Sequence, residues 1–286
     1  MSDQADELRQ LVRRDSLRNR GEWVTPPHRI VVFGGKGGVG ATTAAVSIAV
    51  LLAKHGHRTV LVDADLSSPD VAQMCQIDAH HSVADVLAGR HSVHEVLLRG
   101  PAGLQILPGA WAPEKVTECS SAALHKFIEE INGLGNHADV VVIDVGSGPS
   151  QLVRDFWRSA DAILVVTTAE SQSIVDTYAA IKILAGESPI LPHTLVNRVD
   201  RSAEGQEVHL RIANASRRFL GIEPTSAGFL PNDPSLALLA ENDPIPSTNN
   251  QDSRTQLCLE RIVKTLLVVQ KTHQTTPAAK QESPAA

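Results

Sequence analysis

Aromatic residues, cysteines and long apolar runs are all scarce in this chain of 286 residues, and each scarcity excludes a class of protein. Aromatic residues make up 3%, so the core must be built from Val, Ile, Leu and Ala. The three cysteines lie far apart without a Cys-x-x-Cys pair, which favours reduced cytosolic thiols over a zinc centre or a disulfide framework. No apolar run approaches the roughly 18 residues of a spanning helix, and no signal peptide opens the chain. We therefore expect a cytoplasmic protein.

Positive charge is not in excess either. The chain has 26 Lys and Arg residues against 32 Asp and Glu residues, with a formal net charge of −6 and a pI near 6.0. This balance argues against nucleic-acid binding as the main activity, so we expect no specific nucleic-acid partner. The hydrophobic content of 42%, with few aromatics, suits a parallel sheet that is covered by helices on both faces.

A glycine-rich segment is the most informative feature of the sequence. The apolar run Ile30–Phe33 before it predicts a strand, and the apolar spacing after it predicts a helix. Glycines let backbone N–H groups face an anion, and the helix dipole favours negative charge at that end, so we expect a nucleotide phosphate here. The expected phosphate-binding residues are Gly35, Lys36, Gly37, Gly38, Val39, Gly40, Ala41, Thr42 and Thr43.

The loop departs from the pattern G-x-x-x-x-G-K-[ST] at one position, because Ala41 stands where a lysine would contact the β- and γ-phosphates. A lysine–phosphate contact is worth about 1.5–3 kcal/mol, so its loss predicts binding weaker by about 10–150-fold. The rate should fall further, since the site must stabilise charge on the transferred group. Two hypotheses remain: an ATPase that binds nucleotide with impaired hydrolysis, which we favour, or a pseudo-ATPase scaffold.

Acidic residues follow two other apolar runs. Asp63 and Asp65 come at the end of one predicted strand and point to the same side of it, because alternate residues of a strand share a face. One of the two would orient the attacking water and the other would join the magnesium shell. Asp144 follows the run Val140–Ile143 in the manner of a Walker-B strand, which places it in the magnesium shell as well. An aspartate after a strand is otherwise commonly a helix cap or a turn former.

Strands alternate with helical patterns along the rest of the chain, which predicts an α/β fold with a doubly wound, mostly parallel sheet and helices on both faces. Ligands of such sheets lie beyond the carboxyl ends of the strands. The expected domains are an N-terminal helix within 1–20, a linker at 21–28, a nucleotide-binding domain at 29–271 and a disordered tail at 272–286. The further expected strands are His57–Val62, Leu104–Leu107, Asp139–Ile143, Ala162–Thr167, Leu191–Val196 and Thr225–Leu230.

The last expected helix, Gln256–Gln270, has two interpretations. Its apolar face could lie on a bilayer, which would give the protein a peripheral contact with the inner face of the cell membrane. Alternatively, the helix closes the sheet as part of the core. Few basic residues flank the face, so the electrostatic attraction to lipid would be small, and both interpretations stay open. The residues of this face are Leu259, Ile262, Val263, Leu266 and Leu267.

The phosphate loop, with Lys36 early in it, resembles the deviant Walker ATPases of the MinD/ParA group of P-loop NTPases. Within this group the chain is most similar to the FlhG/FleN branch, which regulates flagellar number and placement. The segment Asp3–Arg9 resembles the D-Q-A-x-x-L-R activator motif of that branch. The stretches Gly100–Gly109 and Val165–Glu170 also resemble it, so the similarity runs from residue 3 to about residue 245.

The resemblance implies ATP or ADP with Mg²⁺ as cofactors and a nucleotide-dependent homodimer in which Lys36 contacts the nucleotide of the partner. It also implies that Asp65 orients the lytic water, that Thr42 binds magnesium and that Thr43 contacts the α-phosphate. Asp63 is then left for the magnesium shell together with Asp144. The residues that would flank the adenine are Asn197, Pro231 and Asp233.

The N-terminal motif implies a partner, the signal-recognition-type GTPase of the flagellar system, whose GTP hydrolysis such a helix would stimulate. A short basic amphipathic segment is otherwise commonly a docked or frayed terminus. Other enzymes on the same loop chemistry fit less well: Tyr178 is the only tyrosine, and Cys119 has no second cysteine nearby for an iron–sulfur centre. The partner-binding residues would be Asp3, Gln4, Ala5, Leu8 and Arg9.

Overall fold

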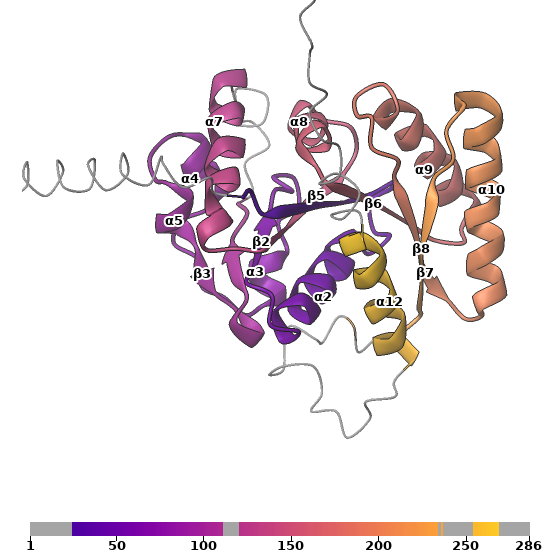
Figure 1. Cartoon of the computed structure of the whole chain (residues 1–286), viewed down its shortest axis with the longest axis horizontal. Helices are drawn as coiled ribbons and strands as arrows, with labels where there is room; N and C mark the ends of the chain where they lie inside the picture. Colours follow the sequence, from indigo (N-terminus) through magenta and orange to yellow (C-terminus); the bar gives the residue numbers. More distant parts are fainter. Residues whose placement is uncertain (1–24, 111–119, 234–235, 237–253, 269–286) are drawn as a thin grey trace, which may run out of the picture.

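The computed structural model of the chain describes residues 25–110, 120–233, 236 and 254–268. The activator-like segment 1–20 and the tail 272–286 lie outside the described residues. A strand and a glycine-rich turn lead into the first long helix, as the sequence predicts (Figure 1).

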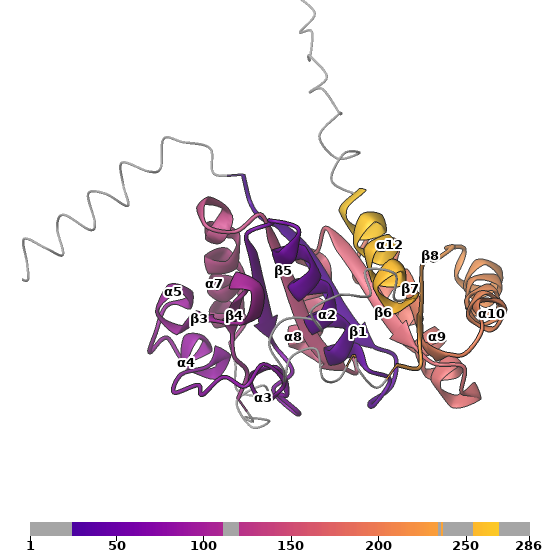
Figure 2. The same cartoon turned by 90° about the horizontal axis from the view of Figure 1, so that it is seen from below.

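Eight strands form one sheet in the order β3-β4-β2-β5-β1-β6-β7-β8, which runs from left to right in Figure 2. Every neighbouring pair is parallel except β3 and β4 at one edge, so the predicted α/β fold with a mostly parallel sheet is confirmed. The strands are β1 (His28–Gly34), β2 (Thr59–Asp63), β3 (Leu98–Arg99), β4 (Gln105–Leu107), β5 (Val140–Ser147), β6 (Ala162–Thr167), β7 (His193–Val199) and β8 (Thr225–Pro231).

Helices cover both faces of the sheet, with α2 and α12 side by side on one face (Figure 1). On the other face lie α7, α8, α9 and α10, which share a second core with the sheet. The helices are α2 (Ala41–Lys54), α3 (Val71–Met74), α4 (Val83–Leu87), α5 (Val93–Val96), α7 (Ser121–Asn132), α8 (Gln151–Ser159), α9 (Ser171–Leu184), α10 (Ser202–Leu220) and α12 (Arg254–Val268), with 3₁₀ turns η2 (Pro101–Gly103) and η3 (Gly133–Asn136).

The side chains of successive residues in a central strand pack alternately into the hydrophobic cores on the two faces of the sheet. In β1, Val31 and Phe33 pack under the layer of α7 to α10, whereas Ile30 and Val32 pack under α2 and α12. Both sides of the strand are therefore buried, and this is why the central strands are continuous apolar runs rather than alternating patterns. The side chains that follow the carboxyl ends of these strands are thus attached to a buried sheet.

The helix α12 belongs to the core. Leu259, Ile262, Val263 and Leu266 are all at most 4% exposed and pack with α2 against the sheet, and Leu267 is partly buried beside them. Each buried aliphatic side chain is worth about 1.5–3 kcal/mol, so lifting this face onto a bilayer would forfeit several such contributions. Of the two interpretations of this helix, the structure supports the core helix. Among the described residues, no helix is long and apolar enough to cross a membrane.

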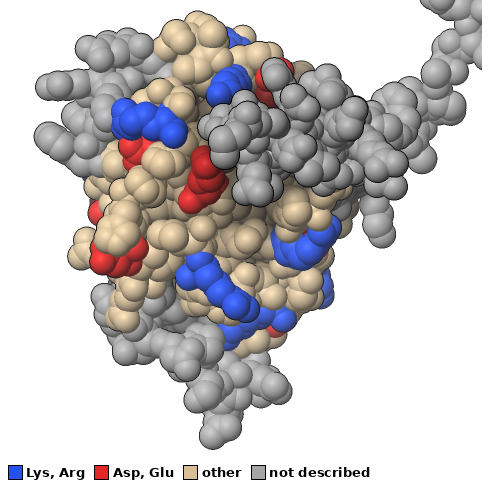
Figure 3. Space-filling model, turned by 90° about the vertical axis from the view of Figure 1, so that its left-hand side faces the viewer, with Lys and Arg blue, Asp and Glu red and all other residues tan. Residues whose placement is uncertain are grey.

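Two parts of the fold were not predicted from the sequence. The edge strand β3 has only two residues, and the helices α3 to α5 between β2 and β3 have four or five residues each. Elements this short carry no readable periodicity. On the face of the molecule shown in Figure 3, acidic and basic side chains are interspersed, and the described residues form no broad basic patch there.

Candidate nucleotide-binding site

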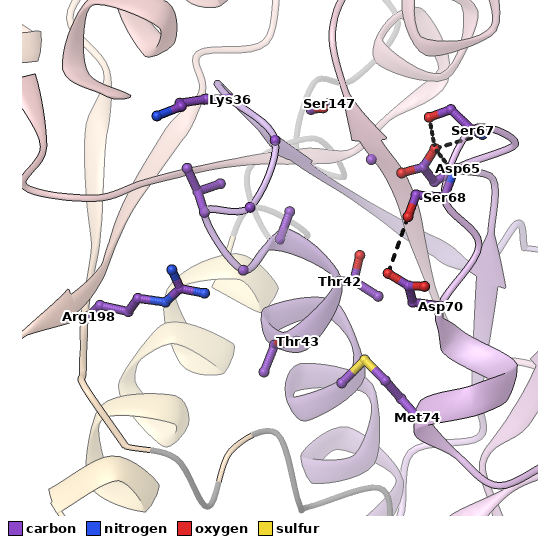
Figure 4. A pocket seen from close by; sticks show the side chains of 16 residues that line it. Lys36, Thr42, Thr43, Asp65, Ser67, Ser68, Asp70, Met74, Ser147 and Arg198 are labelled. Atoms are coloured by element: carbon purple, nitrogen blue, oxygen red, sulfur yellow. Dashed lines mark hydrogen bonds between the residues drawn. The ribbon is translucent and has the colours of Figure 1, made fainter. Parts of the chain in front are cut away.

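The loop between β1 and α2 borders a cavity of about 350 Å³ at the carboxyl ends of the central strands (Figure 4). The cavity lies where the topology of a doubly wound sheet predicts a ligand. Loop residues 36–43 form one wall. The other lining residues are Asp65, Ser67, Ser68, Asp70, Met74, Gly146, Ser147 and Arg198.

Two glycines give the loop its bend. Gly38 and Gly40 have φ values of 80° and 87°, in the left-handed region that side chains rarely adopt. Gly40 is also the residue that precedes α2, and no side chain of the described part of the chain caps this helix end. The first N–H groups of α2 are therefore available at a positive helix end, which is the arrangement that binds phosphate.

Contacts with α9 and β7 hold the phosphate loop in place. A Cβ atom on Gly35 would lie 2.6 Å from the Cα atom of Thr177 in α9, so only glycine fits there. On the other side, the amide of Asn197 donates a hydrogen bond of 2.9 Å to the carbonyl oxygen of Val39. The same amide nitrogen lies where a side chain on Gly40 would be, so β7 and α9 together fix the shape of the loop.

Two carboxylates lie beneath the loop on adjacent strands. Asp63 of β2 and Asp144 of β5 are register partners and are 1% and 0% exposed. Burial, and then the negative charge of Asp144, raise the pKa of Asp63 to about 8. Burial also raises the pKa of Asp144 to about 6, although the Thr42 hydroxyl and the Gly146 N–H act to lower it. A cation at this point would relieve the cost of burying both charges.

The donor set fits a magnesium ion. Asp144 Oδ1 accepts a hydrogen bond of 3.1 Å from the N–H of Gly146, but Asp144 Oδ2 has no hydrogen-bond partner among the described residues. Magnesium prefers hard oxygen ligands and is commonly held by one or two carboxylates together with substrate phosphates. Thr42 supplies a hydroxyl at the start of α2, close enough to affect the Asp144 carboxyl. Asp63 uses both its oxygens locally, accepting from the N–H groups of Asp65 and Val71.

Asp65 is at the edge of the cavity and is held by its own turn. Its Oδ1 accepts hydrogen bonds from the Ser67 N–H at 3.0 Å, the Ser67 hydroxyl at 2.6 Å and the Ser68 N–H at 3.1 Å (Figure 4). Its side chain packs against Gly146, where a Cβ atom would lie 2.8 Å from Asp65 Cβ. The carboxylate is thus oriented and half-buried, as a group that positions water must be.

Lys36 is turned away from Thr42 and Thr43 in Figure 4. Its ammonium lies 3.3 Å from Glu170 Oε2, just before α9, and both side chains are largely exposed, at 40% and 67%. An exposed pair of this kind is worth about 0–1 kcal/mol, so it is easily exchanged for another anion. Within a single chain, Lys36 does not replace the missing lysine of position 41.

The three residues expected around the adenine lie outside the cavity lining. Asn197 is 6% exposed, and its oxygen accepts from the N–H of Arg198 at 2.9 Å while its amide holds Val39. Asp233 accepts a 2.6 Å hydrogen bond from Thr255 at the start of α12, and Pro231 ends β8. Their contact with a base stays a prediction.

Sequence reasoning missed seven cavity residues, namely Ser67, Ser68, Asp70, Met74, Gly146, Ser147 and Arg198. The serines follow Asp65 after one intervening residue, and the pattern Asp-x-Ser-Ser is typical of a turn that an aspartate side chain closes. That signal was available in the sequence. Met74 and Arg198 reach the cavity only through tertiary packing.

Comparisons with known proteins agree with this geometry. A family model described as "ParA: NUBPL iron-transfer P-loop NTPase" matches residues 26–191. The antiactivator FleN of Pseudomonas aeruginosa is 33% identical over 212 residues, which covers 74% of this chain and 76% of FleN. The flagellum site-determining protein YlxH of Helicobacter pylori is 28% identical, and the match covers 66% of this chain and 64% of YlxH.

Solved structures show the same fold. The septum site-determining protein MinD of Pyrococcus horikoshii, complexed with Mg-ADP, superposes with a TM-score of 0.67 at 22% identity, covering 84% of this chain and 96% of that one. The sheet topology, the phosphate loop and these matches together define the class of the protein. The chain belongs to the ParA/MinD-type family of P-loop NTPases.

Proposed function

We propose that the chain is a nucleotide-controlled switch that binds ATP or ADP with Mg²⁺ and regulates flagellar number or placement. The observation that carries the nucleotide part is the start of α2 at the cavity beside the buried Asp144: among the described residues, no side chain caps that helix end and Asp144 Oδ2 has no hydrogen-bond partner. This arrangement offers N–H groups to phosphate and an oxygen to magnesium. The likeness to FleN and YlxH, together with the D-Q-A-x-x-L-R motif, supports the flagellar part.

In this proposal Ala41 impairs hydrolysis more than binding. The backbone N–H groups, Thr42, Asp65 and Asp144 stay available for the nucleotide and its cation. The ammonium that would stabilise charge on the transferred phosphoryl group is missing, and interactions made in the transition state control the rate. Thr43 would contact the α-phosphate, and Asp65 would orient the attacking water.

A homodimer is the second part of the proposal. Lys36 lines the cavity, and among the described residues its ammonium contacts Glu170 alone, in an exposed pair. Exchange of that contact for the nucleotide of a partner subunit would cost little, since an exposed ion pair contributes at most about 1 kcal/mol. Dimerisation would then restore some of the charge that position 41 lacks. Peripheral membrane contact would have to use a surface other than the buried face of α12.

Calorimetric titration of ATP, ADP and GTP with Mg²⁺ tests the nucleotide site. The wild-type chain should bind ATP, Ala41→Lys should bind it about 10–150-fold more tightly, and the ATPase rate should rise by a larger factor. Removal of Mg²⁺ by EDTA should weaken binding of both forms. If the wild type fails to bind and Ala41→Lys binds, the protein is a scaffold with a vestigial site. If neither form binds, the site assignment is wrong.

The partner is tested separately. GTP turnover by the cognate signal-recognition-type GTPase should rise when the full chain is added and should not rise with a chain that lacks residues 1–20. Arg9→Ala should reduce the stimulation because Arg9 belongs to the D-Q-A-x-x-L-R motif. Arg18→Ala removes the same charge from the segment outside the motif and is the matched control. Equal turnover with and without residues 1–20 would refute a role of the motif in GTP hydrolysis.

A further inference from the structure

Two cations line the cavity among the described residues, Lys36 and Arg198. Lys36 is engaged by Glu170 and points away from the start of α2. Arg198 follows Asn197 near the end of β7, and its side chain extends toward the bend of the loop (Figure 4). It is exposed, and its guanidinium makes no hydrogen bond or ion pair with any described residue. No described residue therefore uses the donors of this cation at the cavity wall.

The backbone at Arg198 is held in an unusual conformation. Its φ is 58°, in the left-handed region, which costs a residue other than glycine roughly 1 kcal/mol or more. The hydrogen bond from the Arg198 N–H to Asn197 Oδ1, at 2.9 Å, holds this conformation. The amide of the same Asn197 holds the carbonyl of Val39. Asn197 therefore ties the position of Arg198 to the position of the phosphate loop.

We propose that the guanidinium of Arg198 binds the phosphate chain of the nucleotide and supplies the positive charge that Ala41 removes from the loop. This inference rests on the proposed nucleotide-binding function. Ala41 and Arg198 line the same cavity, so a cation from either position would act on one ligand. Guanidinium is always charged at physiological pH, and its planar set of donors matches two phosphate oxygens at once. It is a chemically suitable replacement for an ammonium.

Guanidinium also stacks on the faces of aromatic rings such as adenine, which is the alternative contact for Arg198. The geometry favours the phosphates, since Arg198 points at the loop bend where phosphate would lie. Two ligands distinguish a contact of Arg198 with the base from a contact with the phosphates. Magnesium tripolyphosphate has the anionic chain without base or ribose, whereas Mg-ATP has both.

The test uses the full chain and measures binding of Mg-ATP and of Mg-tripolyphosphate by calorimetry. Arg198→Ala should weaken both by about 10–150-fold, the loss expected for one charge-assisted contact. Arg198→Lys should lose less than Arg198→Ala. Arg211→Ala, which removes an exposed arginine of α10 outside the cavity, is the matched control and should bind both probes like the wild type. Thermal melting without ligand checks that each variant is folded.

The double variant Ala41→Lys with Arg198→Ala adds a coupling test. If both side chains neutralise the same phosphates, Ala41→Lys should improve binding by a larger factor in the Arg198→Ala background than in the wild type. Equal factors in the two backgrounds would contradict the inference.

Four other outcomes also overturn it, and they separate it from the proposed function. If Arg198→Ala leaves the affinity for both probes unchanged while the wild type binds Mg-ATP, the inference fails and the proposed function stands. If only Mg-ATP is affected, Arg198 contacts base or ribose. If the wild type binds neither probe and Ala41→Lys binds both, Arg198 does not replace the lysine. If neither protein binds either probe, the inference and the nucleotide site fail together.

Discussion

Asp144→Asn separates the charge of the buried carboxylate from its shape. Asn keeps the oxygen that accepts the N–H of Gly146, and its amide replaces the Oδ2 atom that has no partner among the described residues. In the absence of nucleotide, the wild-type protein must bury a carboxylate at 0% exposure. The variant removes this charge without removing a packed side chain.

The magnitude follows from the pKa of Asp144. Its value is about 6 in the folded protein against an ordinary 3.8, so the folded state binds this proton more tightly than the unfolded chain does. The wild type therefore loses stability as the pH rises from about 4 through 6, and at about 1.4 kcal/mol per pKa unit the full loss is about 3 kcal/mol. The Asp144→Asn variant has no charge to gain at this position, so its stability relative to wild type should grow by about 2 kcal/mol between pH 4.5 and 7.5.

Urea unfolding of both proteins at pH 4.5, 6.0 and 7.5, with EDTA and without nucleotide, measures this change. If burying the Asn amide has a cost that does not depend on pH, it shifts the difference in unfolding free energy between variant and wild type equally at all three pH values. The change of that difference with pH is then unaffected. Asp161→Asn is a control, because the pKa shift of Asp161 has the opposite sign: burial acts to raise the pKa of Asp161, but the hydrogen bonds and charge of Arg29 outweigh it and lower the pKa. The stability that Asp161 contributes is lost only as the pH falls below its ordinary pKa of 3.8, so the difference between Asp161→Asn and wild type should stay nearly constant from pH 4.5 to 7.5. A difference for Asp144→Asn that is flat or falls with pH would refute the reasoning.

Two further predictions concern the rim of the cavity. Glu170→Gln should change the free energy of unfolding by at most about 1 kcal/mol, because its contact with Lys36 is exposed, and should lower the protein concentration at which sedimentation detects a dimer with Mg-ATP. Gly146→Ala should destabilise the protein by roughly 1–3 kcal/mol in urea unfolding, since φ is 68° and the new Cβ would meet Asp65. Gly148→Ala, with φ of 87° and no described atom within 4 Å of the added Cβ, should show only the conformational part of this loss.

The sequence was sufficient for the features that depend on local patterns. Buried parallel strands are continuous apolar runs, so β1, β2, β5 and β6 could be located within a few residues of their observed bounds. The glycine loop is a short-range pattern as well, and so are the aspartates at the end of β2 and within β5. The structure places Thr42 and Asp65 in the lining of one cavity, with Asp144 next to Thr42.

The structural features that could not be predicted from the sequence depend on contacts between distant segments of the chain. Asn197 is 158 residues from Val39, and no local pattern indicates that its amide supports the loop carbonyl. The cavity position of Arg198 depends on that same contact. The burial of α12 was undecided for a related reason, because an amphipathic helix has the same periodicity on a sheet as on a membrane. In each case the information lies in packing rather than in propensity.

The shape of the phosphate loop and its charge come from different residues, and this leads to a last prediction. Gly35 determines shape, since a Cβ there would lie 2.6 Å from Thr177 Cα, whereas position 41, which lines the cavity, determines whether a lysine ammonium can reach the ligand. Gly35→Ala should therefore lower the free energy of unfolding by roughly 1–3 kcal/mol and lower Mg-ATP affinity, because α9 or the loop must shift. Gly37→Ala, whose Cβ would lie 3.7 Å from the Ser147 hydroxyl in ordinary contact, is the matched control for stability. Ala41→Lys should raise Mg-ATP affinity, because the new side chain enters at the wall of the cavity. Urea unfolding and calorimetry on the three variants distinguish the two effects, and a Gly35→Ala protein as stable as Gly37→Ala would show that α9 does not hold the loop.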